Sequence, residues 1–324
     1  MTGAAVAVDA AGARMGGAAR FLVELDGYLQ RRGRDDVLVL GRGRSLSPGW
    51  LLRRELPART ALRVVALNNV GFLAPGRERW VLLRNALHFP AQSRGDTRES
   101  DMFEHRAQAQ VVYAMAKRAD VVVVPSSGMA ERVLTLLPDL RRRLVVRHHP
   151  VTPVTPNPRD PTRAVILVPV LFAGYKNMVE HLTALLGALQ AVGRIDVAVQ
   201  VTADEAELRG VAGREASLVP LGRPSYDRLR QAWARCTAVF FPSRIESFGY
   251  PLAEARAAGL PVIAPDTAQN REVAGRCLVP YRTEQPGSLR EAVQRALQEV
   301  FEPDPAPFAP EGYFDWLLGR DGAG

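Results

Sequence analysis

Short runs of apolar residues recur along this sequence, and each is followed by a longer segment with the periodicity of a helix. The runs are apolar throughout rather than alternating with polar residues, which is typical of parallel strands buried between two layers of helices. The pattern therefore predicts an α/β fold with parallel sheets. In the first half we expect strands at Ala4–Asp9, Val37–Leu40, Val64–Leu67, Val81–Leu83, Val121–Val124 and Leu144–Val146, and helices at Ala18–Arg31, Glu99–Lys117 and Met129–Leu136.

A proline-rich segment, Pro150–Pro161, divides the chain and holds five prolines in 12 residues. Such a segment sustains neither a helix nor a central strand, so we interpret it as a linker. With 324 residues, the chain is long enough for two domains. Beyond the linker we expect strands at Ala164–Val168, Val197–Val201, Leu218–Leu221, Ala238–Phe241, Pro261–Ala264 and Cys277–Val279, and helices at Met178–Ala191, Tyr226–Cys236, Leu252–Ala258 and Ser288–Val300.

The composition excludes several classes of protein. With 47% hydrophobic and 23% charged residues, the chain reads as a globular protein rather than a disordered or fibrous one. It has no apolar stretch of the roughly 18 to 20 residues that a membrane span needs, and no signal-peptide pattern at its N-terminus. Cys236 and Cys277 are too few for a disulfide framework or a four-ligand zinc site. We therefore expect a cytoplasmic protein.

The positive charge lies in the first half of the chain. Residues 1–150 carry 24 Lys and Arg against 14 Asp and Glu, whereas residues 151–324 carry 18 against 20. A surplus of this kind favours an anionic partner, such as a phosphorylated acceptor, a membrane surface or a nucleic acid. A general bias toward arginine explains it equally well. Because we find no nucleic-acid-binding motif, we expect an anionic or membrane-associated acceptor rather than DNA or RNA.

The most informative segment is Phe240–Ala264, which reads as a strand, a polar loop, a short helix and a second strand. Pro251 suits the first turn of a helix, and Gly259 suits the left-handed residue that ends one. Ligands bind at the carboxyl ends of strands in open α/β sheets. The backbone amides around Gly249 and Tyr250 would form a helix N-terminus, which attracts phosphate.

Two glutamates, Glu246 and Glu254, stand eight residues apart in this segment. A carboxylate accepts hydrogen bonds from two neighbouring hydroxyls, so the pair suits a ligand with a sugar at one end and a ribose at the other. The segment resembles the Glu-x7-Glu motif of retaining GT-B glycosyltransferases, in particular those of glycosyltransferase family 4, the group 1 type. Its Pro-Ser, Phe-Gly-Tyr-Pro, Glu-Ala and Gly-Leu-Pro-Val pieces stand where that family has them.

The resemblance implies a role for each residue of the motif. Glu246 would contact the transferred sugar and Glu254 the ribose, while the backbone at Ser247, Phe248 and Gly249, with Tyr250 beside it, would hold the sugar and phosphates. The alternative is that Glu246 is an ordinary loop acid and that Glu254 only stabilises the dipole of its helix.

The resemblance also assigns Lys176 to the donor diphosphate and to catalysis. The sequence Asn177-Met-Val-Glu180 that follows it predicts a capping box at the start of a helix. An ordinary surface lysine is the alternative. The family usually has an arginine a few residues earlier, yet residues 168–174 contain none. Either another cation such as Arg244 supplies the second charge, or phosphate binding is weakened.

Two weaker signals lie in the first half. Gly16 and Gly17 follow the first predicted strand and resemble the glycine loop with which these enzymes approach the donor phosphates. A glycine turn between a strand and a helix also forms without a ligand. His88 follows another predicted strand, where the family places an acceptor-side catalytic residue. An ordinary loop histidine is the alternative.

The resemblance implies a GT-B fold, in which two doubly wound Rossmann-like domains face a central cleft. Residues 1–150 would bind the acceptor, 151–302 the nucleotide-sugar donor, and 303–324 would form a helix that crosses back to the first domain. The implied reaction is sugar transfer with retention of configuration. No Asp-x-Asp motif is present, so we expect neither a metal nor another cofactor. The alternative function is a catalytically silent GT-B protein that binds a nucleotide-sugar or a partner subunit.

Overall fold

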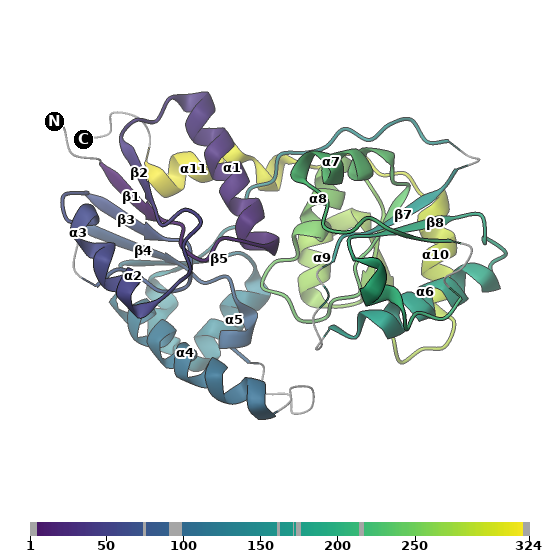
Figure 1. The fold of residues 1–324 in the computed structure, drawn as a ribbon, viewed down its shortest axis with the longest axis horizontal. Coiled ribbons are helices and arrows are strands. Elements are labelled where there is room, and N and C mark those ends of the chain that lie inside the picture. Colours follow the sequence, from purple (N-terminus) through teal and green to yellow (C-terminus); the bar gives the residue numbers. More distant parts are fainter. Residues whose placement is uncertain are drawn as a thin grey trace. The chain divides into compact units, whose positions relative to one another are not determined.

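The computed structural model describes residues 5–73, 76–90, 99–160, 163–170, 172, 176–213 and 217–319, with only the backbone for 99–107. The chain divides into two compact units. Unit 1 comprises Met1–Pro150, Glu246–Phe248 and Phe308–Gly324, and unit 2 comprises Val151–Ile245 and Gly249–Pro307. Figure 1 shows that each unit contains a sheet with helices packed around it.

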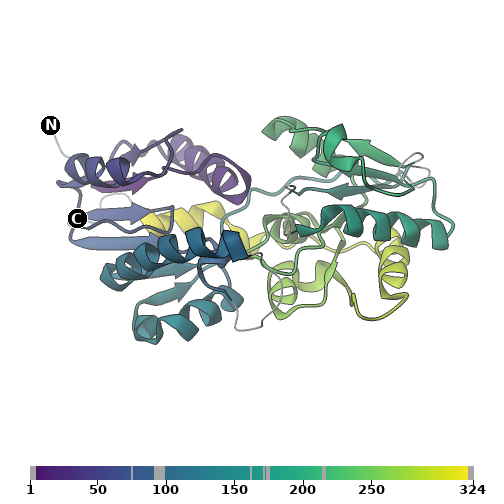
Figure 2. The same ribbon diagram turned by 60° about the horizontal axis from the view of Figure 1, so that its bottom comes forward.

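Unit 1 is built on a six-stranded sheet with the order β2-β1-β3-β4-β5-β6, in which every pairing is parallel. Helices cover both faces of this sheet (Figure 2). Its strands are β1 (Val6–Asp9), β2 (Val37–Leu40), β3 (Arg63–Ala66), β4 (Glu78–Leu82), β5 (Val121–Val124) and β6 (Leu144–Val146). Its helices are α1 (Gly16–Arg32), α2 (Pro48–Arg53), α3 (Glu55–Ala58), α4 (Glu99–Arg118), α5 (Ser127–Leu136) and α11 (Pro310–Leu318), with 3-10 turns η1 (Ala86–His88) and η2 (Pro138–Arg142); a third turn, η6 (Ala306–Phe308), begins in unit 2 and ends in unit 1.

Unit 2 repeats this architecture with a parallel sheet of order β12-β11-β10-β7-β8-β9. Its strands are β7 (Val165–Val168), β8 (Ala198–Val201), β9 (Leu218–Pro220), β10 (Ala238–Phe240), β11 (Val262–Pro265) and β12 (Leu278–Tyr281). Its helices are α6 (Met178–Ala191), α7 (Tyr226–Arg235), α8 (Tyr250–Ala258), α9 (Ala268–Ala274) and α10 (Ser288–Gln298), with 3-10 turns η4 (Glu205–Leu208) and η5 (Gly275–Cys277).

The strands form where the sequence concentrates buried apolar side chains. In unit 1 the side chains of Val64, Val81 and Val122, on three neighbouring strands, are fully buried in one core cluster. Polar residues set the ends of the helices that cover them. The Ser126 hydroxyl accepts the Met129 N–H at 3.1 Å and caps α5, and Gly33 ends α1 in the left-handed conformation. Because the strands of each sheet are parallel, their carboxyl ends lie at one edge of that sheet.

The structure corrects one detail predicted for the start of α6. Asn177 is the N-cap residue, but its backbone is left-handed, with φ 44° and ψ 42°, and its side chain makes no capping hydrogen bond. A capping side chain reaches the N–H groups of the first turn from an extended backbone, which Asn177 does not have. The predicted capping box of Asn177 and Glu180 is therefore wrong, although the helix starts at the expected residue.

The helix α11 packs within unit 1, and both views show it beside α1 (Figures 1 and 2). The Phe21 ring of α1 meets the rings of Tyr313 and Phe314 edge to face, at centroid distances of 5.7 and 5.5 Å. The Tyr28 hydroxyl donates to the Asp315 carboxylate at 2.6 Å, and burial, together with this contact, raises the pKa of Tyr28 to about 12. Aromatic packing and buried hydrogen bonds thus hold the C-terminal segment on the N-terminal sheet.

Candidate functional site

The turn between β10 and α8 has the geometry of an anion-binding helix start. Gly249 is the N-cap residue with φ 84° and ψ 73°, a conformation that side chains disfavour. A Cβ atom at this position would lie 2.9 Å from Leu252 Cδ1, so the turn is also too tight for one. Pro251 stands in the first turn, as predicted, and no side chain caps the helix. Backbone N–H groups therefore begin α8 without a side-chain acceptor.

The three residues before Gly249 belong to unit 1. The Ser247 hydroxyl donates to the Arg84 carbonyl oxygen at 2.7 Å, and the Ser247 carbonyl oxygen accepts from the Ser126 hydroxyl at 2.8 Å. The buried Phe248 ring packs on His149 and Phe308 at centroid distances of 5.1 and 6.2 Å. These contacts fix the backbone directly after the half-buried Glu246.

Glu254 and Lys176 both lie in unit 2, near one edge of its sheet. Glu254 is half-buried in α8, four residues after Tyr250 begins that helix. Lys176 is half-buried and stands two residues before α6 begins at Met178. The strands that lead into these two helices, β10 and β7, are parallel neighbours. The lysine and the start of α8 therefore follow adjacent strands at their carboxyl ends, where open α/β sheets bind ligands.

Arg244 adds a second cation to this edge. Its guanidinium donates to the Thr283 hydroxyl at 2.7 Å. Burial lowers the pKa of the His181 imidazole, Glu180 raises it, and the charge of Arg244 lowers it again. Because His181 lies in the first turns of α6, the charge of Arg244 acts on the helix that Lys176 precedes. This placement makes Arg244 a candidate for the cation that is absent from residues 168–174.

The glycine loop of unit 1 is held by a cation that the sequence analysis missed. Gly16 starts α1 with φ 57°, and the N-cap residue Met15 gives no side-chain cap. The Arg84 guanidinium donates to the Gly17 carbonyl oxygen at 2.8 Å and lies 4.6 Å above the Phe21 ring. Arg84 directly follows the apolar run of β4, which is the signal that would have marked it as a residue of the sheet edge.

His88 lies in the same loop after β4, but its imidazole is largely buried, with 7% of the residue exposed. It is the last residue of the turn η1, which the Asn85 side chain caps by accepting the Leu87 N–H. The His88 Nε2 atom is 3.4 Å from Asn85 Nδ2, and the Tyr113 hydroxyl donates to the His88 carbonyl oxygen at 2.5 Å. The side chain of His88 is therefore mostly shielded from solvent, rather than exposed on the loop after β4.

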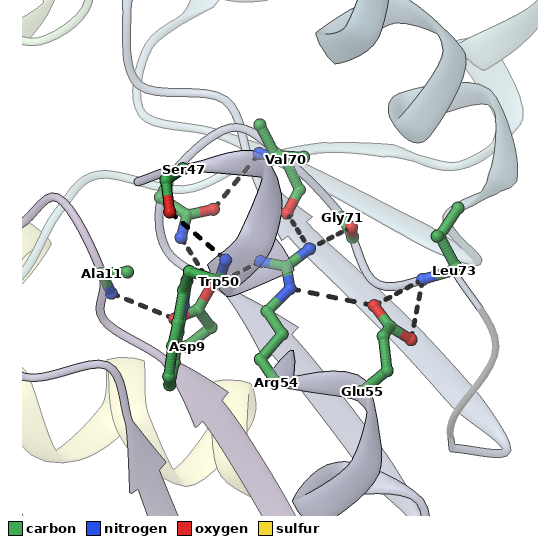
Figure 3. A network of polar contacts seen from close by, with 10 residues as sticks. Asp9, Ala11, Ser47, Trp50, Arg54, Glu55, Val70, Gly71 and Leu73 are labelled. Atoms are coloured by element: carbon green, nitrogen blue, oxygen red, sulfur yellow. Dashed lines mark hydrogen bonds and ion pairs between the residues drawn. The ribbon is translucent and has the colours of Figure 1, made fainter. Parts of the chain in front are cut away.

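A buried ionic centre lies at the carboxyl end of β1 (Figure 3). The Asp9 carboxylate is fully buried and forms an ion pair with the Arg54 guanidinium, of which 1% is exposed. It also accepts the Ala11 N–H at 3.1 Å, the Trp50 Nε1–H at 3.0 Å and the Asn68 Nδ2–H at 2.7 Å. We refer to Asp9, Trp50, Arg54 and Asn68 as the Asp9 hub.

The Asp9 hub joins the loops that follow three strands. Ala11 belongs to the loop after β1, and Asn68 to the loop after β3, where Arg54 also donates to the carbonyl oxygens of Val70 and Gly71. The loop after β2 passes so close that a Cβ on Gly41 would lie 2.7 Å from Asp9 Oδ1. The loop that leads to Gly16 and Gly17 therefore starts from a point fixed by charge and close packing.

The described residues contain neither a metal-binding cluster nor a membrane-spanning helix. No group of three or more His, Cys, Asp or Glu side chains is arranged to hold a metal ion. No helix in this part of the chain is long and apolar enough to cross a membrane. The two cysteines, Cys236 and Cys277, are buried free thiols, and burial raises their pKa values to about 12 and about 11.

Solved structures share this fold over nearly the whole chain. WaaG, a glycosyltransferase involved in lipopolysaccharide biosynthesis, is 14% identical with a TM-score of 0.66, covering 97% of this chain and 100% of that one. HepE from Anabaena, solved with UDP and glucose, is 14% identical with a TM-score of 0.62, covering 96% and 94%. Sucrose-phosphate synthase from Thermosynechococcus elongatus is 15% identical with a TM-score of 0.60, covering 95% and 92%.

These similarities, with the two parallel six-stranded sheets, define the class of the protein: it has the GT-B fold, as the sequence predicted. In the second half of the chain, residues 169–299 match the model of the glycosyl transferases group 1. Over these residues the resemblance found in the sequence is confirmed. A search of curated proteins gave no match.

Proposed function

We propose that this chain transfers a sugar from a nucleoside-diphosphate sugar to an acceptor, with retention of configuration and without a metal ion. The observation that carries the proposal is the uncapped start of α8 at Gly249, with Glu246 before it and Glu254 one turn into the helix. The family match spans this turn. Related folds support a nucleotide-sugar donor, since HepE was solved with UDP and glucose and a pneumococcal O-GlcNAc transferase with UDP and GlcNAc.

The nucleotide half of the proposed donor site lies in unit 2. Glu254 would accept hydrogen bonds from the ribose hydroxyls, because a carboxylate can bind two neighbouring hydroxyls. Lys176 and Arg244 would balance the charge of the diphosphate, and the amides of Gly249 and Tyr250 would donate to it. The main contribution to catalysis would be electrostatic, since these groups stabilise the leaving diphosphate as its charge develops.

The residues proposed for the transferred sugar and the acceptor lie in unit 1. Glu246 would bind the sugar, together with the backbone at Ser247 and Phe248. Gly16 and Gly17 would bring the start of α1 close to the phosphates. His88 remains a proposed acceptor-side catalytic residue, although only 7% of the residue is exposed.

The proposal is tested by a thermal-shift panel of uridine, guanosine and thymidine diphosphates and their sugars. A nucleotide that binds only the folded state at 100 times its Kd adds about 2.7 kcal/mol of stability and so raises Tm. Glu254→Ala should abolish this shift, whereas Glu246→Ala should retain it and lose transfer. Glu291→Ala is the matched control, because Glu291 is another acid near the start of a unit 2 helix. If none of the nucleotides raises Tm, the donor assignment is wrong.

Metal independence and retention need an active preparation. Once the donor is known, transfer should survive EDTA, and the product should keep the donor's anomeric configuration when it is followed by NMR from the first turnovers. Loss of transfer that Mg²⁺ or Mn²⁺ restores would contradict the first expectation. An inverted product would contradict the second.

One observation favours a second function, a silent subunit that binds a nucleotide-sugar or a partner. Residues 168–174 lack the arginine that the family usually has before Lys176. If Arg244 replaces it, Arg244→Gln should lower both donor affinity and transfer. A protein that binds the donor and neither transfers nor hydrolyses the sugar would support the silent subunit.

A further inference from the structure

Four leucines are exposed around one short helical stretch of unit 1. The helices α2 and α3 are separated only by Arg54, and between them they expose Leu52 and Leu56, at 68% and 65%. These two leucines are four residues apart and therefore share a side of the stretch. Leu62 and Leu73 follow, with 50% and 42% exposed. Single exposed leucines are ordinary, but a group of them marks a surface that contacts something apolar.

Hydrogen bonds bring the segments that carry these leucines together. The Leu73 N–H donates to the carboxylate of Glu55, the first residue of α3, at 3.1 and 3.2 Å to its two oxygens. The Arg77 N–H donates to the Leu62 carbonyl oxygen at 2.7 Å. Leu73 is thus held beside the first residue of α3, and Leu62 lies beside Arg77.

The Asp9 hub fixes which side of α2 and α3 faces outward. Trp50 and Arg54 point to Asp9 from this stretch, and the Arg54 side chain is almost completely buried (Figure 3). Ala58 is fully buried on the same inner side. Leu52 and Leu56 cannot turn inward unless the buried ion pair breaks, and breaking such a pair is costly. Their exposure is therefore a property of the folded unit.

The charges around the leucines are positive. Arg53, Arg59 and Arg77 are exposed, and none of the three forms an ion pair with any residue that the structure describes. The nearest acids along the chain are engaged. Glu55 accepts from Leu73 and lies 3.8 Å from the Arg54 guanidinium, and Glu78 forms a 2.7 Å ion pair with Arg63. The surface therefore combines apolar side chains with uncompensated positive charge.

We propose that this leucine–arginine face, made of Leu52, Arg53, Leu56, Arg59, Leu62, Leu73 and Arg77, docks on an anionic lipid bilayer. The leucines enter the boundary between headgroups and acyl chains, and each arginine contributes about 1 kcal/mol of attraction to anionic lipids. Charge complementarity selects this occupant over an apolar face of a second copy, which would bring the same arginines against each other. The inference deepens the proposed function by locating the acceptor at a membrane surface, but it does not depend on sugar transfer.

Vesicle sedimentation with the full chain tests the proposal. The protein should bind vesicles of phosphatidylcholine with about one third phosphatidylglycerol, and should leave them as salt screens the charges beyond about 8 Å at physiological ionic strength. Binding to phosphatidylcholine alone should be at least tenfold weaker. The pair Leu52→Ser and Leu56→Ser should weaken binding to the anionic vesicles at least tenfold, and the pair Arg53→Gln and Arg59→Gln should do the same.

Two matched controls come from the same chain. Ile195 and Val300 of unit 2 are exposed to a similar degree, at 66% and 72%, so Ile195→Ser with Val300→Ser should leave vesicle binding unchanged. Arg141→Gln with Arg142→Gln removes two exposed charges of unit 1 from the turn η2. This pair should weaken vesicle binding less than Arg53→Gln with Arg59→Gln does.

Three results would overturn the proposal. The first is no binding to anionic vesicles, and the second is equal binding of all variants. The third is a dimer of the unaltered protein, seen by light scattering, that the leucine pair abolishes while vesicle binding is retained. Retained Tm values show that each variant folds. A nucleotide-induced Tm shift that persists in the leucine variant separates failure of this surface from failure of the donor site.

Discussion

The two units have the same architecture, but different interactions hold the loops at the carboxyl edges of their sheets. At the edge of unit 1 a buried carboxylate accepts N–H groups from two loops and from the stretch of α2 and α3, so side-chain charge holds these segments in place. At the edge of unit 2 the turn before α8 depends on Gly249, whose left-handed backbone and close contact with Leu252 leave no room for a side chain.

Because of this difference, substitutions at the two edges should affect different properties of the protein. A buried ion pair ties its partners to the stability of the whole unit, since loss of one partner leaves an uncompensated charge. A glycine turn contributes little to burial, but it sets the direction of a few backbone N–H groups. We therefore expect changes at the unit 1 edge to act mainly on folding, and changes at the unit 2 edge to act mainly on ligand binding.

The largest effect is expected at the Asp9 hub. Asp9→Ala should lower the free energy of unfolding by about 3 to 5 kcal/mol, because it leaves the Arg54 guanidinium buried without its carboxylate. Urea unfolding measures this loss. The double variant Asp9→Ala with Arg54→Met should recover part of it. A loss below about 1 kcal/mol would place the hub among ordinary surface ion pairs.

Gly249→Ala should cost about 1 to 3 kcal/mol, because alanine is strained at φ 84° and its Cβ would meet Leu252. Gly193→Ala is the matched control, since Gly193 has φ 69° with nothing within 4 Å of a Cβ. The comparison between the units predicts that Gly249→Ala also removes the nucleotide-induced Tm shift, and that Gly193→Ala retains it. Equal effects on the shift would show that the turn does not orient the binding groups.

The next effect is a pH dependence in the aromatic cluster of unit 1. Burial lowers the pKa of His149 well below its usual value, and the charges of Arg84 and His148 lower it further. Below about pH 6.5 the unfolded chain takes up a proton that the folded chain does not, so stability falls by up to about 1.4 kcal/mol per pH unit. His149→Phe should flatten unfolding curves compared between pH 7 and 5. His181→Gln in unit 2 should flatten them less, and the reverse order would be evidence against His149.

The smallest effect is expected at the exposed pair Arg79 and Asp120, which are 3.1 Å apart. The hydrogen bond from Arg79 holds the pKa of Asp120 below its usual value, so this contribution is present above about pH 4 and is lost in more acidic solution. Asp120→Asn should cost at most about 1 kcal/mol at neutral pH, because water screens the pair. If Asp120→Asn lowered the free energy of unfolding as much as Asp9→Ala does, the buried ion pair would contribute no more than the exposed one.

Local pattern was enough to predict most of the fold. The strands at 37–40, 121–124 and 144–146 have the predicted bounds, because each is a continuous apolar run. The helices α2, α3 and α9 were not predicted, since stretches of six, four and seven residues are too short to show a helical period. Pro251 was predicted to lie in the first turn of α8, because the fixed φ of proline and its missing N–H suit that position.

The remaining features depend on residues that are far apart in the sequence. Asp9 lies 45 residues from Arg54, and in the sequence it reads as the polar end of a strand while Arg54 reads as half of a surface Arg-Arg pair. Ser247 and Phe248 read as a loop of the second half, yet contacts with Ser126 and His149 group them with unit 1. A local pattern carries no information about such partners.

The place of Phe308–Leu318 in unit 1 has a consequence for the order in which the chain folds as it is made. These residues leave the ribosome after every residue on which they pack, including Phe21 and Tyr28 near the opposite end. Until then the nascent first unit exposes the aromatic side of α1, while the sheet of unit 2 already has all its strands. Domains usually complete in the order of synthesis. Here the unit that begins first is finished last, and a stall in translation before Phe308 would leave the earlier unit open to aggregation.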